Sequence, residues 1–169
     1  MINILTIEPI KQFMLKRASV NFIINLILTF GIQCWALRHF DNISFSSGEQ
    51  SLVRTFLPMS FFLPLFVTMD SAKRFFANAF DEKIPYFVPE KYKTFKFRFI
   101  LGLKNAGWSL LIFSIILAAV FLLSPKNMMF NSMMVIIILT SVAGVMAVIF
   151  TITPIMHIQK AIKKQNSIP

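Results

Sequence analysis

The chain has 169 residues, of which 56% are apolar and only 14% are charged, and its mean hydropathy is +0.70. Soluble domains are about 45–50% apolar, so this composition argues against a soluble protein. The net charge of +10 would suit a nucleic-acid partner, but long uncharged stretches separate the basic residues. We therefore expect no nucleic-acid binding.

Four apolar stretches can cross a membrane, because a hydrocarbon core of about 30 Å needs about 20 helical residues. Three of them are the uncharged intervals Arg17–Arg38, Lys104–Lys126 and Lys126–Lys160, and the fourth lies between Arg54 and Asp70. A soluble all-α domain would have to bury four helices that have little polar face. The sequence therefore predicts an all-α, polytopic membrane protein, a single domain over 1–169 with spans at about 18–37, 48–69, 103–123 and 132–153.

The basic residues are distributed unevenly between the two sides that four crossings would create. Only Arg38, Arg54 and Lys126 fall on one side, which leaves 14 of the 17 Lys and Arg residues on the other. Cytoplasmic loops are enriched in Lys and Arg. We expect cytoplasmic N and C termini in a bacterial inner membrane, with anionic lipid headgroups as partners of the basic residues.

The first apolar stretch could instead be a cleaved signal peptide. Its uncharged run of about 20 residues is longer than a typical signal-peptide core, and no small-x-small cleavage site follows it. We therefore expect an uncleaved anchor. The single cysteine, Cys34, excludes an internal disulfide.

Four polar residues recur every four positions in the first span: Asn21, Asn25, Thr29 and Gln33. At about 100° per residue they form one slanted row, here called the polar stripe. Amides are costly when they face lipid, so the row should face protein or water. Three interpretations stay open: hydrogen bonds between helices of the same chain, a hydrated path for a polar solute, or an interface with a partner or a second copy.

The second span carries start signals and two prolines. Ser46-x-x-Glu49 and Ser47-x-x-Gln50 have the capping-box spacing, which predicts a helix start near Ser47. Pro58 and Pro64 each remove a helix hydrogen bond, and they predict either packing kinks or a hinge.

The segment from Asp70 to Arg98 is predicted to be a cytoplasmic loop that ends in alternating basic and aromatic residues. The basic ones are Lys91, Lys93, Lys96 and Arg98, and the aromatic ones are Tyr92, Phe95, Phe97 and Phe99. Such a run can bind single-stranded nucleic acid. Because it leads directly into a membrane span, we expect the basic residues to contact lipid headgroups and the aromatic rings to dip toward the acyl chains.

The fourth span contains small residues at four-residue spacing. Thr140-x-x-x-Gly144 and Ala143-x-x-x-Ala147 permit close helix approach, so Thr140, Gly144 and Ala147 form a candidate packing face. Pro154 is expected to kink the inner end of this helix.

No ionisable residue lies near the predicted middle of any span, which argues against a proton relay or an ion-coupled transporter. His39 and His157 are expected on opposite sides, and no nucleophile is spaced from a base as catalysis requires. We therefore expect no enzyme, no cofactor and no metal site.

Two resemblances follow from particular residues. The run Asn21-Phe-Ile-Ile-Asn25-Leu-Ile, with Gly31, Trp35 and Leu37 and a Pro-containing second helix, resembles uncharacterised small four-helix bacterial inner-membrane proteins. The end of the last span, Thr151-Ile-Thr-Pro154 followed by Lys160, Lys163 and Lys164, is similar to immunity proteins against pore-forming colicins. That second resemblance implies a binding partner within the membrane rather than an activity.

The sequence thus favours an integral membrane protein that acts through helix–helix contacts with a membrane partner, as an immunity-type protein, an accessory subunit or a homo-oligomer. The alternative is a small oligomeric channel or transporter that uses the polar stripe and the Pro-containing second helix.

Overall fold

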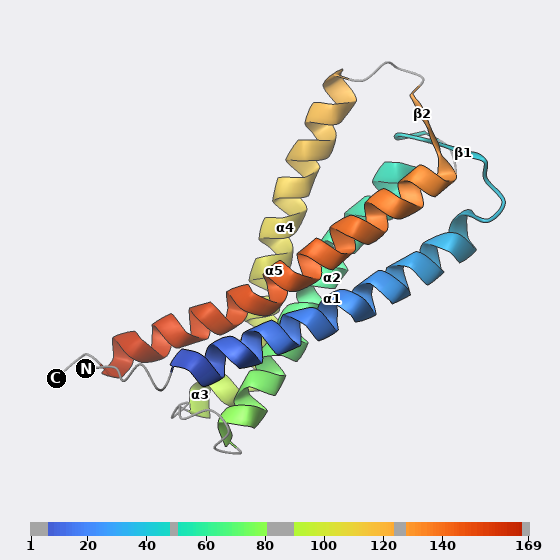
Figure 1. Cartoon of the computed structure of the whole chain (residues 1–169). Helices are drawn as coiled ribbons and strands as arrows, with labels where there is room; N and C mark the ends of the chain where they lie inside the picture. Colours follow the sequence, from blue (N-terminus) through green and yellow to red (C-terminus); the bar gives the residue numbers. More distant parts are fainter. Residues whose placement is uncertain (1–6, 48–50, 81–89, 124–127, 167–169) are drawn as a thin grey trace.

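The computed structural model describes residues 7–47, 51–80, 90–123 and 128–166, with side chains for 10–47, 51–79, 92–123 and 128–160. Figure 1 shows long helices joined by short segments. The elements are α1 (Ile7–Leu37), β1 (Asn42–Ser44), α2 (Leu52–Phe80), α3 (Glu90–Lys93), α4 (Phe95–Leu123), β2 (Met129–Asn131) and α5 (Ser132–Asn166). Four of these helices, α1, α2, α4 and α5, are long and apolar enough to cross a membrane, which confirms the predicted all-α membrane fold.

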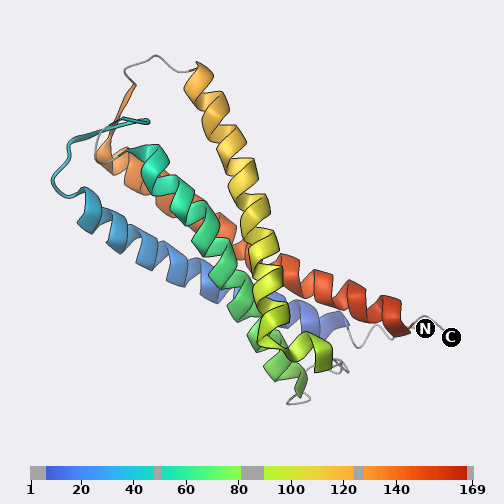
Figure 2. The same cartoon turned by 180° about the vertical axis from the view of Figure 1, so that it is seen from behind.

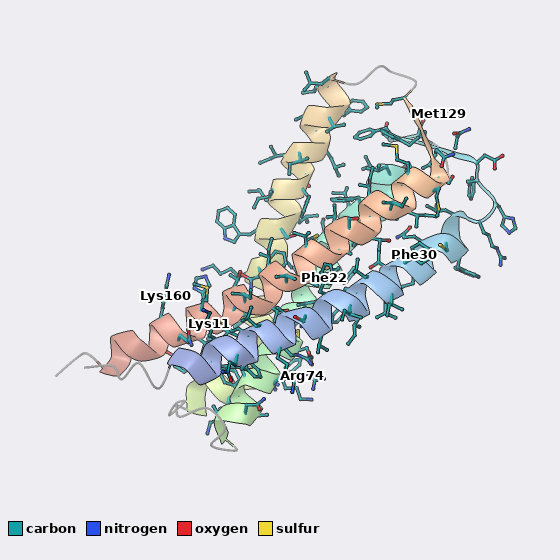
Figure 3. The ribbon with its side chains drawn as sticks, in the orientation of Figure 1. Lys11, Phe22, Phe30, Arg74, Met129 and Lys160 are labelled. Carbon is teal, nitrogen blue, oxygen red and sulfur yellow. The ribbon has the colours of Figure 1, made fainter. Side chains whose placement is uncertain are left out.

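The long helices run alternately up and down, so α1 and α4 begin at the end of the molecule where α2 and α5 finish (Figures 1 and 2). We call this the basic end, and Figure 3 shows Lys11, Arg74 and Lys160 there. The opposite end carries the two short strands and is called the sheet end. Arg38 and Arg54 lie close to the sheet end, at the end of α1 and the start of α2.

The principal helix pairs are α1 with α5, α5 with α2, and α2 with α4. The last pair includes a close approach at Gly102, where an added Cβ would lie 3.1 Å from the carbonyl oxygen of Leu65. Next to it, the Asn105 amide donates a hydrogen bond of 3.1 Å to Thr68 Oγ1. Toward the sheet end α4 diverges from the other helices in both views (Figures 1 and 2).

All four spans continue further at the basic end than the sequence predicted. α1 begins at Ile7, α2 runs to Phe80 and α4 begins at Phe95, so much of the predicted loop from Asp70 to Arg98 is helix. The reason is a second apolar cluster beyond the span limits. Its buried members are Ile10, Ala72, Phe75, Phe76, Ile155 and Ile158. The charged residues between them resemble helix ends in the sequence, although most of them, such as Lys11, Lys16 and Lys73, lie on the exposed faces of continuous helices.

Pro154 does not interrupt the last helix, which continues to Asn166. Pro154 is buried and lies directly before Ile155, a member of the basic-end cluster. Packing on both sides of the proline therefore keeps the chain helical, although one backbone hydrogen bond is lost. Pro58 and Pro64 likewise lie inside α2.

The predicted start of the second span near Ser47 is wrong, because α2 begins at Leu52. The cap is Ser51, a fully buried residue whose Oγ accepts a hydrogen bond of 3.3 Å from the backbone N–H of Arg54. This is the N-cap geometry. The expected capping partners Glu49 and Gln50 lie outside the described residues.

The segments that join the spans at the sheet end pair with each other. β1 and β2 are antiparallel, with Ile43 opposite Phe130. The backbone N–H of Ser132 also donates to the Asp41 carbonyl at 3.0 Å. Ile43 and Phe45 then close the sheet-end core over Leu37, Phe56 and Leu139, among others. This small sheet ties the start of α5 to the segment after α1.

Candidate functional site

The polar stripe of α1 faces other helices of the same chain at its first member. Asn21 is buried, and its amide Nδ2 donates to Thr151 Oγ1 on α5 at 2.8 Å and to Ser71 Oγ on α2 at 3.3 Å. Thr151 in turn donates to the carbonyl of Ala147. One amide therefore joins three helices, as the intramolecular interpretation of the stripe predicted for this residue.

The other three residues of the polar stripe contribute less to contacts between helices. The Asn25 amide donates to the backbone carbonyl of Asn21, four residues earlier in the same helix. Asn25 and Thr29 are half-buried, whereas Gln33 is buried. Within the described part of the chain, Gln33 Oε1 has no hydrogen-bond partner. Asn21, rather than Asn25, is therefore the residue that links helices.

An ion cluster lies one turn from Asn21. Asp70 pairs with Arg74 at 3.0 Å, four residues later in the same helix. Asp70 also pairs with Arg17 of α1, whose side chain is only 14% exposed. Sequence reasoning does not find the Arg17 pair, because a charge at that position is typical of the end of a span. The signal available was that Arg17 continues the four-residue period of the polar stripe.

These groups form one layer across the molecule, here called the polar layer: Arg17, Asn21, Asp70, Ser71 and Thr151. Each lies about 16–20 residues from the sheet-end terminus of its helix, which is about 24–30 Å of helix. Lys104 of α4 lies at a similar distance from Leu123. Since the hydrocarbon core is about 30 Å thick, a core that begins at the sheet-end termini would have its other boundary at this layer.

The candidate packing face on α5 meets α1. A Cβ added to Gly144 would lie 2.8–3.1 Å from the side chains of Phe22 and Leu26, and both Ala143 and Ala147 are fully buried. Thr140 is half-buried, and its Oγ1 has no partner among the described residues. The small residues thus allow α5 to approach α1 closely.

The expected headgroup residues lie at the basic end, but the neighbouring rings divide into two groups. Lys93 and Lys96 are exposed, Arg98 is half-buried, and the side chain of Lys91 lies outside the described residues. Phe95 and Phe99 stack at 6.1 Å on an exposed face. Tyr92 and Phe97 instead pack against the apolar cluster around Phe75 at the basic end. The alternation of basic and aromatic residues in the sequence does not set the direction of each ring, because the helical period does.

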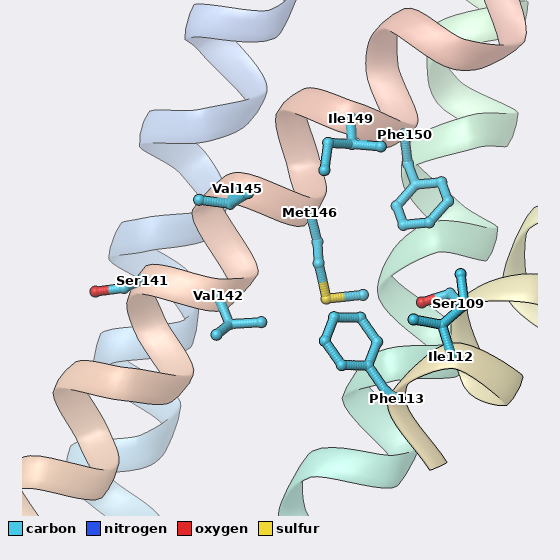
Figure 4. Close-up of a pocket in the computed structure, with 9 residues that line it drawn as sticks. All are labelled: Ser109, Ile112, Phe113, Ser141, Val142, Val145, Met146, Ile149 and Phe150. Atoms are coloured by element: carbon cyan, nitrogen blue, oxygen red, sulfur yellow. The ribbon is translucent and has the colours of Figure 1, made fainter. Parts of the chain in front are cut away.

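A groove of about 460 Å³ opens between α4 and α5 (Figure 4). Its lining is apolar apart from two serines: Ser109, Ile112, Phe113, Ser141, Val142, Val145, Met146, Ile149 and Phe150. Ser109 is 2% exposed, and its hydroxyl has no hydrogen-bond partner within the described part of the chain. Sequence reasoning missed this groove, because nothing in α4 itself indicates which face lacks a neighbour.

Among the described residues no three His, Cys, Asp or Glu side chains lie close enough to hold a metal ion. Comparison with models of known protein families, with curated proteins and with solved structures finds no match for this chain.

We predict that Asn21→Leu destabilises the protein by about 1–2 kcal/mol. The substitution removes two interhelical hydrogen bonds, which average about 0.6 kcal/mol each in membrane proteins, and it leaves the buried hydroxyl oxygens of Ser71 and Thr151 without this donor. Asn25→Leu should change stability by less than about 0.5 kcal/mol, because within the described residues the Asn25 amide bonds to its own helix and to no other. Unfolding in mixed micelles, followed by circular dichroism, measures both. Equal losses would contradict the assignment of Asn21 as the link.

Proposed function

We propose that this chain is an integral membrane protein that performs no catalysis and binds a transmembrane helix of a partner in the groove between α4 and α5. The observation that carries the proposal is the groove itself, an apolar hollow of about 460 Å³ on α4, with the unpartnered Ser109 hydroxyl buried beside it in the described part of the chain. Rotation of the Ser109 side chain would offer this hydroxyl to a hydroxyl or amide of a second helix, whereas lipid tails offer no hydrogen-bond partner.

The exposure of α4 supports the same interpretation. In the most apolar 18-residue stretch of α4 only 11% is buried, compared with 39% in the corresponding stretches of α2 and α5. Several of its large apolar side chains are exposed, including Trp108, Ile115 and Phe121. In a bilayer, apolar exposure alone does not drive association, because lipid is equally apolar. The buried hydroxyl and the shape of the groove therefore supply the specificity.

The alternative of a channel or transporter finds less support. The Asn21 amide is already bonded to α2 and α5, and Gly144 brings α5 against Phe22 and Leu26. A polar path along the stripe would require these contacts to open. The resemblance to immunity proteins would make the partner a helical pore-forming domain, and an accessory subunit would bind a resident membrane protein in the same way.

We further propose a bacterial inner-membrane location with the basic end in the cytoplasm. A reporter that is active only in the periplasm should stay inactive when it is fused after Pro169, and it should be active when inserted after His39, between α1 and β1. The physical reason is the excess of Lys and Arg at the basic end. An active C-terminal fusion would overturn this orientation.

The groove is tested by a photoreactive amino acid at Ile112 or Val145, with Ile27 and Ile32 of α1 as equally exposed control positions. In native membranes the groove positions should give one discrete protein adduct that the control positions lack. Ser109→Ala should weaken this adduct about threefold to tenfold, as the loss of one interhelical hydrogen bond would. It should not lower the stability of the isolated chain, because the hydroxyl has no partner there.

Ser114→Ala, on an exposed position of the same helix, is the matched control and should leave the adduct unchanged. An adduct between two copies of this chain would identify the partner helix as its own. Adducts only to phospholipid, or the same adducts from α1 and from the groove, would refute the proposal.

A further inference from the structure

A second cavity, of about 300 Å³, lies between α1 and α2 at the basic end. It is separate from the α4–α5 groove and from the basic residues of α4. Seven residues line it: Phe13, Lys16, Arg17, Val20, Arg74, Ala77 and Asn78. Three of these are cationic, three are apolar and one is an amide.

Among the described side chains, the charges around this cavity do not cancel. Asp70 pairs with both Arg17 and Arg74, so in that part of the chain three cations stand against one anion, which is a surplus of two positive charges. Asp70 also holds the two guanidinium groups in place from one side. Arg17 Nε is buried and has no hydrogen-bond partner in the described part of the chain. The cavity thus offers preorganised donors for an anion.

The depth of the cavity indicates where such an anion would come from. Arg17 and Arg74 both lie about 20 residues from the sheet-end terminus of their helices, which is about one hydrocarbon thickness. Lipid phosphates lie at this level. Val20, one turn further into the core, is 37% exposed and can contact the first methylenes of an acyl chain.

We propose that this cavity binds the phosphodiester headgroup of an anionic glycerophospholipid, with Lys16, Arg17 and Arg74 on the phosphate, Val20 on the glycerol and upper acyl chain, and Ala77 on the headgroup side. Basic pockets between transmembrane helices at the cytoplasmic face are suited to such headgroups. The exposed Val20 on the core side favours a lipid over free phosphate, and the surplus charge favours an anionic lipid over a zwitterionic one.

The test is native mass spectrometry of the full chain in detergent, titrated separately with phosphatidylglycerol and with phosphatidylcholine. The wild type should retain one phosphatidylglycerol in preference to phosphatidylcholine. Lys16→Gln with Arg74→Gln should weaken that retention at least about tenfold, since each basic residue near an anionic lipid adds a roughly fivefold attraction. Arg17 is left in place, because removing it would unpair Asp70.

Lys93→Gln with Lys96→Gln removes the same charge elsewhere at the basic end and should change retention less than about twofold. Ala77→Trp fills the cavity with a large side chain without changing its charge, and it should also abolish the preference. Ala118→Trp, on the exposed face of α4, should not. Thermal unfolding checks that each variant is folded.

Four results would overturn the proposal. The first three are no preference for phosphatidylglycerol, equal losses in the Lys16/Arg74 and Lys93/Lys96 double variants, and full retention in Ala77→Trp. Competition by millimolar inorganic phosphate would identify a free-phosphate site and would equally refute binding of a lipid.

Discussion

Helices in a bilayer are not driven together by the hydrophobic effect, because lipid tails are as apolar as the side chains that they contact. In this protein the polar layer supplies the missing constraint. Asn21 joins α1 to α2 and α5 through two hydroxyls, and Asp70 joins α1 to α2 through Arg17. Both contacts lie at the same depth, so they fix the rotation and the axial register of three helices at once.

The rest of the fold follows from this register. On the sheet side of the layer, α5 approaches α1 at Gly144, and the short β1–β2 sheet then closes the far end. On the basic side, the same three helices continue and enclose Phe75, Ile155 and Ile158. α4 contributes no member of the polar layer. It is held by α2 through Gly102 and Asn105, which leaves its face toward α5 open as a groove.

The arrangement also separates two kinds of surface. Around the layer, the described cations of the α1–α2 cavity lie at headgroup depth, with the exposed Val20 on their core side, which suits a lipid. In the core, the α4–α5 groove is apolar and contains one buried hydroxyl, which suits another helix. These two surfaces are formed by different helices, so occupation of one does not block the other.

The sequence alone predicts the four spans, because apolar length and missing charge are strong signals. It also predicts that Asn21 is buried, since an amide in hydrocarbon needs a partner. It cannot predict the partner, because Ser71 and Thr151 are ordinary residues until the fold brings them to Asn21. For a related reason, the predicted spans are too short at the basic end. A charged side chain on the outward face, such as Lys73, resembles the end of a span, although Phe75 beside it is buried.

The central claim is that the polar layer couples α1 to α2, and a double-mutant cycle on Arg17 and Asp70 tests it most directly. Arg17→Gln, Asp70→Asn and the double variant would be unfolded in mixed micelles beside the wild type. We predict a coupling free energy of at least about 1 kcal/mol, because each single variant leaves a partly buried charge without its interhelical partner. Effects that add within about 0.5 kcal/mol would contradict the account, because they would show that the two helices do not depend on this pair.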